Sequence, residues 1–393
     1  MIGMCWRITA STAFAAMMIA ATGCAAQSPP KAGAADSGAD GIYVAASAIK
    51  RGRAAPDLAF QNRDASGVYI RVAWNQLSPA RGRYDWTSLD RELRRAVQNN
   101  KKISIGLRTG SSSPDWLYAA GVPGETFVSG AKGGRTGRCV RERMPVPWSA
   151  GYVSAFGDMM QAMSAHIRQT GAYSNVRVVR LTPMTARAEE MRIPSGDGQN
   201  RRARAKGCDM GNSFALWRKH GYRPATVVQA WQTMAQSVNK AFPDKTLSVA
   251  VLRNNDFPST DAQGEPTPKN SDRRVDVKDQ ILRWGGRAFP GRFMVQRNAL
   301  SPSERSEGVL ADARSYGARI GFQTNLWRGS GSGSGCGVQR GQRRVDCGPD
   351  GYRALLKRGI DLGTTYIEVW SVDAERYPSQ IAEADLELRR LNR

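Results

Sequence analysis

Acidic residues lie at the ends of two apolar runs, where a carboxyl group can be held in place and still reach a cleft. Ala188-Glu189-Glu190-Met191-Arg192 follows one such run, and Glu368 lies within another. Two carboxyl groups that face one cleft can act as a general acid and as a base or nucleophile. Repulsion between adjacent carboxylates favours the protonated form of one of them, which suits a proton donor. Two glutamates in a row are equally typical of a solvated loop.

Eight short β-like runs separated by helical patterns could position these residues. Strands that alternate with helices predict a parallel sheet, and eight repeats predict closure into an α/β fold of the (β/α)8 TIM barrel type. The expected strands are Gly41–Ala46, Val68–Asn75, Ile103–Arg108, Val176–Pro183, Leu247–Asn254, Phe293–Asn298, Ile320–Asn325 and Thr365–Trp370.

Alternation along each strand predicts which side chains point into the barrel. Val68, Ile70 and Val72 must face the helices, so Arg71 and Asn75 point inward. The same argument places further residues inside, namely Arg108, Asn254, Gln296, Asn298, Gln323, Asn325, Tyr366, Glu368 and Trp370. The alternation of the fourth strand is ambiguous, and there it favours Arg180 and Thr182 as the inward pair. A buried carboxylate must be paired or take part in chemistry. Glu368 therefore either pairs with Arg71 or Arg108, or acts on a substrate.

The connections from strand to helix are long after the third, fourth and seventh runs, at Thr109–Trp148, Met184–Arg223 and Leu326–Pro349. In (β/α)8 barrels these loops form the active face. The additional residues in these loops either form a rim that binds substrate or are a lineage-specific insertion without that role. All four cysteines beyond the N-terminal region lie in these loops, and an even number predicts two disulfides in an oxidising compartment. We expect Cys336 to pair with Cys347 within one Gly-rich loop, and Cys139 to pair with Cys208.

Three short motifs between Gly67 and Leu117 indicate a family. They are Trp74 to Pro79, Tyr84-Asp85-Trp86 and Pro114-Asp115-Trp116, which lie at a strand end, a helix start and the loop after the next strand. This segment resembles the glycoside hydrolases of clan A, especially the relatives of the thermophile β-galactosidases. The resemblance implies a (β/α)8 barrel that hydrolyses glycosidic bonds with two carboxyl groups.

In that family the acid/base glutamate ends the fourth strand and the nucleophile ends the seventh. The resemblance therefore implies that Glu190 is the proton donor, with Glu189 as the alternative. Two features depart from the family. The Asn-Glu pair common at the end of the fourth strand is absent, and the seventh strand reads IGFQTNLW, with Gln323 or Thr324 where a glutamate is expected. Either Glu368 takes the second role, or the mechanism is not the retaining one, or the protein binds sugars without cleaving them.

Aromatic and polar residues near the strand ends are candidate substrate contacts. Trp74, Trp116, Trp327 and Trp370 could stack on sugar rings, whereas Trp231 and Trp86 fit a core or helix-packing role. The inward arginines favour an acidic sugar. The full set of predicted substrate-binding residues is Arg71, Trp74, Asn75, Arg108, Trp116, Asn254, Asn298, Gln323, Asn325, Trp327 and Trp370.

The N-terminal segment has the features of a secretion signal. Arg7 precedes an apolar run from Ile8 to Ala21, which ends at Thr22-Gly23-Cys24. Its length is too short for a spanning helix. The end resembles a bacterial lipobox with Cys24 as the lipidated residue, and plain cleavage near Ala26 is the alternative. We expect a signal at 1–23, a flexible tether at 24–40 and the barrel at 41–393, in an exported protein anchored in the cell envelope.

Composition excludes several other classes of function. The chain of 393 residues carries 57 Lys and Arg against 34 Asp and Glu, a net charge of +23. The basic residues are scattered and no nucleic-acid motif accompanies them, so we expect an anionic glycan or cell surface as partner rather than nucleic acid. With only His166 and His220, and no C-x-x-C, we expect no metal site and no Ser-His-Asp triad. No phosphate-binding loop is present, and we expect no cofactor.

Two hypotheses follow. The first is an exported glycoside hydrolase-like barrel that acts on a polysaccharide. The second is a non-catalytic glycan-binding lipoprotein on the same barrel. The sugar, the linkage and the oligomeric state do not follow from the sequence.

Overall fold

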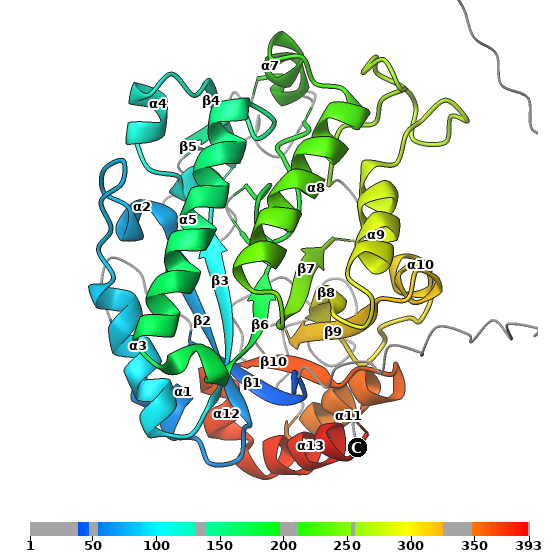
Figure 1. Ribbon diagram of the computed structural model, residues 1–393. Coiled ribbons are helices and arrows are strands. Elements are labelled where there is room, and N and C mark those ends of the chain that lie inside the picture. Colours follow the sequence, from blue (N-terminus) through cyan, green and yellow to red (C-terminus); the bar gives the residue numbers. More distant parts are fainter. Residues whose placement is uncertain are drawn as a thin grey trace, which may run out of the picture. The chain divides into compact units, whose positions relative to one another are not determined.

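The computed structural model describes residues 38–46, 54–130, 139–186, 188–196, 211–252, 256–324 and 348–391. Eight parallel strands form a closed barrel in the order β1-β10-β9-β8-β7-β6-β3-β2. Helices surround these strands, with α3, α5 and α8 in front of the barrel in Figure 1. The strands are β1 (Gly41–Ala45), β2 (Gly67–Ala73), β3 (Lys102–Arg108), β6 (Val176–Arg180), β7 (Thr246–Val251), β8 (Phe293–Leu300), β9 (Arg319–Thr324) and β10 (Tyr366–Trp370).

The predicted (β/α)8 barrel is confirmed, and each of the eight expected runs overlaps one barrel strand. Between the strands lie helices of very different length. They are α1 (Asp57–Gln61), α2 (Trp74–Leu77), α3 (Thr87–Gln98), α4 (Trp116–Ala119), α5 (Ala150–Gln169), α7 (Ser213–Lys219), α8 (Pro224–Ala241), α9 (Val277–Ala288), α10 (Val309–Ser315), α11 (Gly348–Asp361), α12 (Ser371–Arg376) and α13 (Pro378–Arg390).

Local sequence explains where several helices begin. The Asp85 carboxylate accepts a hydrogen bond from the Thr87 backbone N–H at 3.0 Å, just before α3. Asp276 caps α9 in the same way, at 3.0 Å from the backbone N–H of Asp279. Pro224 occupies the first turn of α8, where its missing N–H costs nothing.

The apolar core has two parts, as the alternation along the strands predicts. Val68, Ile70 and Val72 of β2 are buried in a large cluster that also contains the apolar helix faces. A smaller cluster fills the inside of the barrel near its lower end, and it consists of Ala39, Tyr43, Val178, Met294 and Tyr366. Between this cluster and the carboxyl ends of the strands, the interior of the barrel is polar.

The long connection after β3 contains a feature that the sequence did not reveal. Strands β4 (Gly124–Gly130) and β5 (Cys139–Pro145) pair as an antiparallel two-stranded sheet outside the barrel. Cys139 is disulfide-bonded. Cys208, Cys336 and Cys347 lie outside the described residues, so both predicted pairings stay predictions. The predicted signal at 1–23 and residues 24–37 of the predicted tether at 24–40 lie outside them too.

Among the described residues, no helix is long and apolar enough to cross a bilayer. The same residues contain no group of three or more His, Cys, Asp or Glu side chains arranged to hold a metal ion.

Candidate functional site

The centre of the polar barrel interior is Arg180, the last residue of β6. Its side chain is almost completely buried. One terminal nitrogen lies 3.3 Å from a carboxylate oxygen of Glu189. The other contacts Glu368 and donates to the Gln296 side chain at 2.8 Å. The guanidinium carbon also lies 4.3 Å from the centre of the Tyr69 ring. A single arginine therefore joins two of the three predicted carboxylates.

Glu368, on β10, has no exposed surface. One carboxylate oxygen accepts hydrogen bonds from Arg180 and from the Tyr366 hydroxyl. The other accepts a hydrogen bond from the Gln323 side chain at 2.6 Å. Of the two alternatives for this residue, pairing with arginine is the one the geometry favours. The partner is Arg180, rather than the expected Arg71 or Arg108.

Glu189 is also sealed within the interior, with 3% of its side chain exposed. It accepts a hydrogen bond from the Tyr69 hydroxyl. Arg71 of β2 covers its other oxygen at 3.5 Å, and the carboxylate raises the pKa of the Arg71 guanidinium. Burial raises the pKa of the Tyr69 phenol well above its ordinary value, so this hydroxyl remains a hydrogen-bond donor.

Glu190 differs from its neighbour because it is only half-buried. Its carboxylate accepts a hydrogen bond from the Asn298 side chain at 3.2 Å. Its backbone pairs with Ala250 of β7, and the Met191 backbone N–H donates to the Ala250 carbonyl at 2.7 Å. The segment therefore takes the place beside β7 that a longer β6 would occupy, and it holds Glu190 at the carboxyl end of the strands.

A chain of hydrogen bonds joins Glu190 to the buried carboxylates. Gln296 accepts from Arg180 and donates to Asn298 at 3.1 Å, and Asn298 in turn donates to Glu190. The predicted residues Glu190, Asn298, Gln323 and Glu368 thus belong to one network at the upper end of the barrel.

The loop that carries the two glutamates is fixed by close backbone contact with the loop after β3. Gly110 has φ +58°, and a Cβ at this position would lie 2.1 Å from the Thr185 carbonyl oxygen. The Ser111 backbone N–H donates to the Ala186 carbonyl at 3.2 Å, and the Thr109 hydroxyl donates to the Thr182 carbonyl at 2.5 Å. The side chain of Thr182 was expected to point inward. Its backbone carbonyl accepts the hydrogen bond from Thr109, in the loop after β3.

Two arginines line the mouth of the barrel, where the strands end. Arg71 is 26% exposed, and its guanidinium carbon lies 6.0 Å from the centre of the Trp370 ring. Arg108, at the end of β3, is half-buried, and burial together with the nearby Arg71 lowers its pKa. Glu189, Tyr69 and, least of the three, Glu142 of β5 act in the opposite direction on the pKa of Arg108. The mouth thus combines two cations, an aromatic ring and a carboxylate that comes from outside the barrel.

Trp370 is half-buried, and its indole N–H donates to the Thr324 carbonyl at 2.8 Å. Trp74 does not lie at the mouth. It is fully buried, with its ring centre 5.7 Å from that of Tyr152 and 6.1 Å from that of Phe156. The strand ends at Ala73, and α2 starts at once and turns Trp74 towards α5. Trp74 is therefore a core residue, which corrects the expected sugar-stacking role.

Trp116 and Asn75 also differ in place from the expectation. Trp116 is half-buried and lines, together with Trp74, a cavity of about 390 Å³ between α2, α4 and α5. Its indole N–H donates to the Ser78 carbonyl at 3.0 Å. Asn75 lies in the first turn of α2 and is exposed, rather than at the inward end of β2. The predicted contacts Asn254, Asn325 and Trp327 lie outside the described residues.

Sequence reasoning missed two members of this site. Tyr69 lies two positions before Arg71, so the same alternation that predicts Arg71 as inward also predicts Tyr69. No alternation of this kind indicates Glu142, because it lies on β5, in a segment that the sequence predicts to be a loop.

Comparison with known proteins agrees with this geometry. A glycoside hydrolase family 42 model, described as beta-galactosidase, matches residues 63–178, which include the segment that carries the three motifs. The match covers less than a third of the chain. Among curated proteins, none matches the sequence.

Solved structures align with this chain at low identity, and the first of them has a TM-score above 0.5. The catalytic domain of beta-amylase from Paenibacillus polymyxa aligns with a TM-score of 0.53 and 11% identity, over 84% of this chain and 92% of that one. Xylanase 10B from Thermotoga maritima aligns with a TM-score of 0.46 and 10% identity, over 91% and 98%. Beta-galactosidase from the psychrophilic Marinomonas ef1 gives 0.47 and 12%, over 89% of this chain and 59% of that one. The chain has a glycoside hydrolase-like barrel.

Proposed function

We propose that this chain is a glycosidase-type protein that binds a saccharide at the mouth of the barrel, with Glu190 as its proton donor. The observation that carries the proposal is the contrast among the three interior glutamates. Glu189 and Glu368 are sealed, whereas Glu190 is half-buried at the strand ends and is held by Asn298. A donor in this place can give its proton to the leaving-group oxygen of a glycosidic bond while a water molecule attacks the anomeric carbon, so that the bond to the leaving group breaks as the bond to water forms. The family 42 match supports the reaction class.

The groups around the mouth favour an acidic sugar. Arg71 and Arg108 supply two positive charges that a carboxylate or sulfate group can pair with. Trp370 supplies a partly exposed ring for stacking on the apolar face of a sugar. Glu142 brings a further carboxylate to the side of the mouth formed by β3. In this proposal Glu368 is a positioning residue that holds Arg180.

A second function, saccharide binding without cleavage, is favoured by one specific observation. Both carboxylate oxygens of Glu368 are held by hydrogen bonds and none of its surface is exposed. If Glu368 is the second carboxylate of the reaction, it must first lose a partner. If Glu368 keeps its hydrogen-bond partners and no other carboxylate takes its role, the barrel binds a sugar and releases it without cleavage.

The decisive experiment measures reducing-end release from neutral and acidic polysaccharides, together with affinity for the same sugars. We expect Glu190→Gln to lower the rate by about 100-fold or more while affinity changes little, because the amide cannot donate a proton as a carboxylic acid does. Glu387→Gln, at an exposed glutamate of α13, is the matched control. Release that persists in Glu190→Gln contradicts the assignment of the donor. If the unmodified chain binds a polysaccharide but releases no reducing ends from it, the second function is the correct one.

We also propose that the protein is exported and anchored through a lipid on Cys24. Its support is the N-terminal pattern of Arg7, an apolar run and Thr22-Gly23-Cys24. We expect Cys24→Ala to move the full chain from the membrane fraction to the soluble fraction of a bacterial host, with loss of labelling by radioactive palmitate. Cys5→Ala is the matched control, and equal labelling of Cys24→Ala and the unmodified chain contradicts the anchor.

A further inference from the structure

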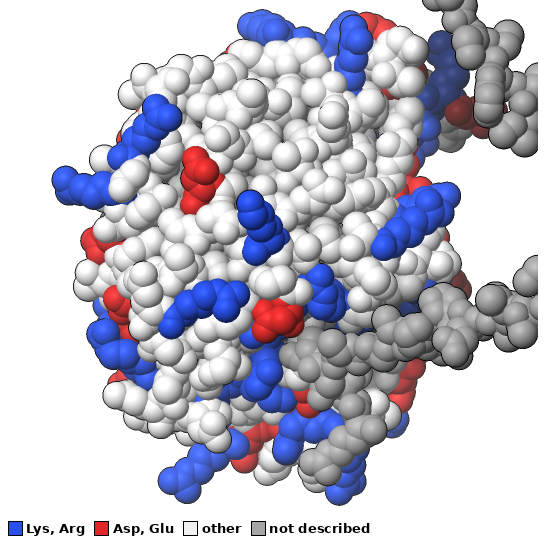
Figure 2. Space-filling view, viewed as in Figure 1, with Lys and Arg blue, Asp and Glu red and all other residues white. Residues whose placement is uncertain are grey.

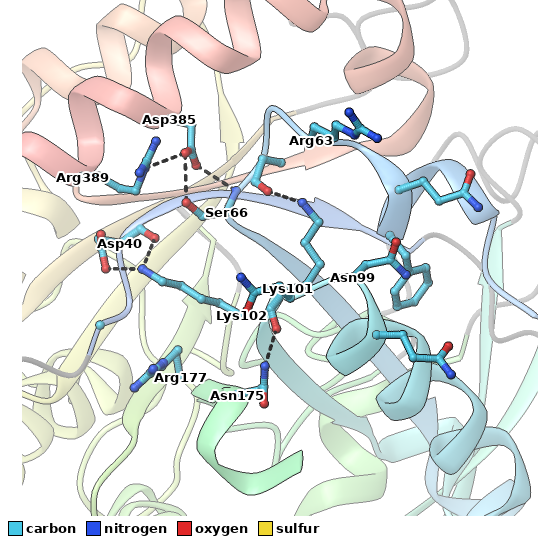
Figure 3. A pocket seen from close by; sticks show the side chains of 16 residues that line it. Asp40, Arg63, Ser66, Asn99, Lys101, Lys102, Asn175, Arg177, Asp385 and Arg389 are labelled. Atoms are coloured by element: carbon cyan, nitrogen blue, oxygen red, sulfur yellow. Dashed lines mark hydrogen bonds and ion pairs between the residues drawn. The ribbon is translucent and has the colours of Figure 1, made fainter. Parts of the chain in front are cut away.

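A large cavity lies at the end of the barrel opposite the mouth. Its volume is about 980 Å³, which is at the upper end of the range for small-molecule sites. Residues at the amino ends of β2, β3 and β6 line it, together with the last helix and the end of α3 (Figure 3). The site proposed above uses none of these residues.

The lining has more positive than negative charge. Two carboxylates are present, and each is already used. Asp40 pairs with Lys102 at 2.8 Å. Asp385 pairs with Arg389 at 2.8 Å and accepts hydrogen bonds from the backbone N–H groups of Ile42 and Ser66 at 2.7 and 3.0 Å. Both acidic groups are thus neutralised by their own partners.

Three cations remain around the cavity, and none of them pairs with a carboxylate of the described residues. Lys101 is buried, and its ammonium group donates to the carbonyl oxygens of Asn62 and Ala65. Burial lowers the pKa of Lys101, so a nearby anion would stabilise its charged form. Arg63 is exposed at the rim. Arg177 is half-buried at the start of β6.

Arg177 gives the most direct sign of a missing ligand. Its Nε–H is buried and has no hydrogen-bond partner among the residues that the structure describes. The side chain lies against Gly38, where a Cβ would be 3.4 Å from the guanidinium carbon. A buried cationic donor without an acceptor costs free energy, and an anion in the cavity would supply the acceptor.

The neutral groups around the cavity indicate what carries the anion. The side chains of Gln61, Gln98 and Asn100 are exposed there, and amides of this kind suit the hydroxyl groups of sugars. An aromatic platform for a nucleobase is absent from the described lining, because Phe60 is buried and its face is covered by Arg95 at 4.2 Å. This combination fits a sulfated or carboxylated saccharide better than a nucleotide.

The concentration of charge is local. On the face shown in Figure 2, Lys and Arg side chains are spread out, with acidic side chains between them. A surface that attracts polyanions only through its net charge needs no particular cavity. Arg63, Lys101 and Arg177 instead surround one hollow of ligand size.

We propose that this cavity is a second saccharide-binding site, separate from the mouth, which takes an acidic sugar group between Arg63, Lys101 and Arg177. The proposal does not depend on the function assigned to the mouth.

The test is calorimetric titration of the full chain with a sulfated dextran oligosaccharide at low and physiological salt, with unsulfated dextran as the neutral probe. We expect Arg63→Gln/Arg177→Gln to weaken binding of the sulfated probe by about tenfold or more. Arg287→Gln/Arg305→Gln removes two exposed charges elsewhere and is the control for net charge. Arg71→Gln removes the contribution of the mouth to the titration, and the binding component that Arg63→Gln/Arg177→Gln weakens should remain in this variant. Unfolding curves of all variants show whether each remains folded.

Three results would overturn the proposal. Equal weakening in the Arg287→Gln/Arg305→Gln control would show that diffuse surface charge binds the probe. Unchanged binding in Arg63→Gln/Arg177→Gln would place the probe elsewhere. Binding to vesicles of phosphatidylglycerol without binding to the sulfated oligosaccharide would identify a membrane surface as the partner instead.

Discussion

Replacing Arg180 by methionine should lower the free energy of unfolding by about 3–5 kcal/mol. The change removes the cation that lies between Glu189 and Glu368 and leaves both carboxylates buried with fewer donors. Tyr366 and Gln323 still donate to Glu368, but neither carries a positive charge. The loss can be measured by urea unfolding followed by circular dichroism, with the midpoint and slope compared between variants.

A matched pair at the surface gives the reference value for this prediction. Arg218 and Glu265 form an ion pair in which both side chains are about half exposed. Arg218→Met should therefore cost less than about 1 kcal/mol. A triple variant, Arg180→Met/Glu189→Gln/Glu368→Gln, should recover a large part of the stability, because no buried carboxylate is left without a cation and Arg71, which loses Glu189, is 26% exposed to water. If Arg180→Met costs no more than Arg218→Met, the interior network does not stabilise the barrel.

Replacing Trp74 by alanine should have an effect of similar size for a different reason. The side chain is fully buried between α2 and α5 and contacts the rings of Tyr152 and Phe156. Truncation of such a residue to alanine costs about 3–5 kcal/mol through lost burial and the cavity that remains. We expect saccharide affinity of the folded protein to be unchanged, because Trp74 does not reach the mouth.

Trp370→Ala is the matched variant, because Trp370 is the half-buried tryptophan beside Arg71. It should weaken saccharide binding by about tenfold, with a much smaller loss of stability. Urea unfolding and calorimetric titration of both variants separate the two roles, and Trp74→Leu serves where Trp74→Ala does not fold. A Trp74 variant that keeps its stability and loses its affinity would contradict the core assignment.

The barrel was predictable because its strands are distinct in sequence. Most are apolar runs covered on the outer face by helices, and each is followed by a helix with its own apolar face. The hairpin of β4 and β5 was missed because its sequence lacks such a run. CVRERMP of β5 has three consecutive charged residues at its centre, and its first five positions are exposed or half-buried. A short strand pair outside the core has no burial pattern to indicate it.

The site was predictable at the level of strand faces but not of individual partners. Alternation identified Arg71, Arg180 and Glu368 as inward residues, which the contacts confirm. The sequence does not indicate which arginine pairs with Glu368, because Arg180 lies 188 positions away from it in the chain. The choice between Glu189 and Glu190 depends on the pairing of one short segment with β7, and a shift of one residue exchanges the two side chains. The position of the Trp74 side chain depends on whether a helix starts directly after the strand. The strand-end motif alone does not show this.

Closure of the barrel joins the two ends of the described chain. β1 pairs along its whole length with β10, from Gly41 with Tyr366 to Ala45 with Trp370. The Ile42 backbone N–H is bound by Asp385, 343 positions later. During synthesis, therefore, β1 has no partner on this side until almost the entire chain has been made. Contacts of such long range form slowly and leave an open strand edge exposed to aggregation in the meantime. If the chain is exported as proposed, crossing the membrane unfolded would postpone this last pairing until the C-terminus has passed through.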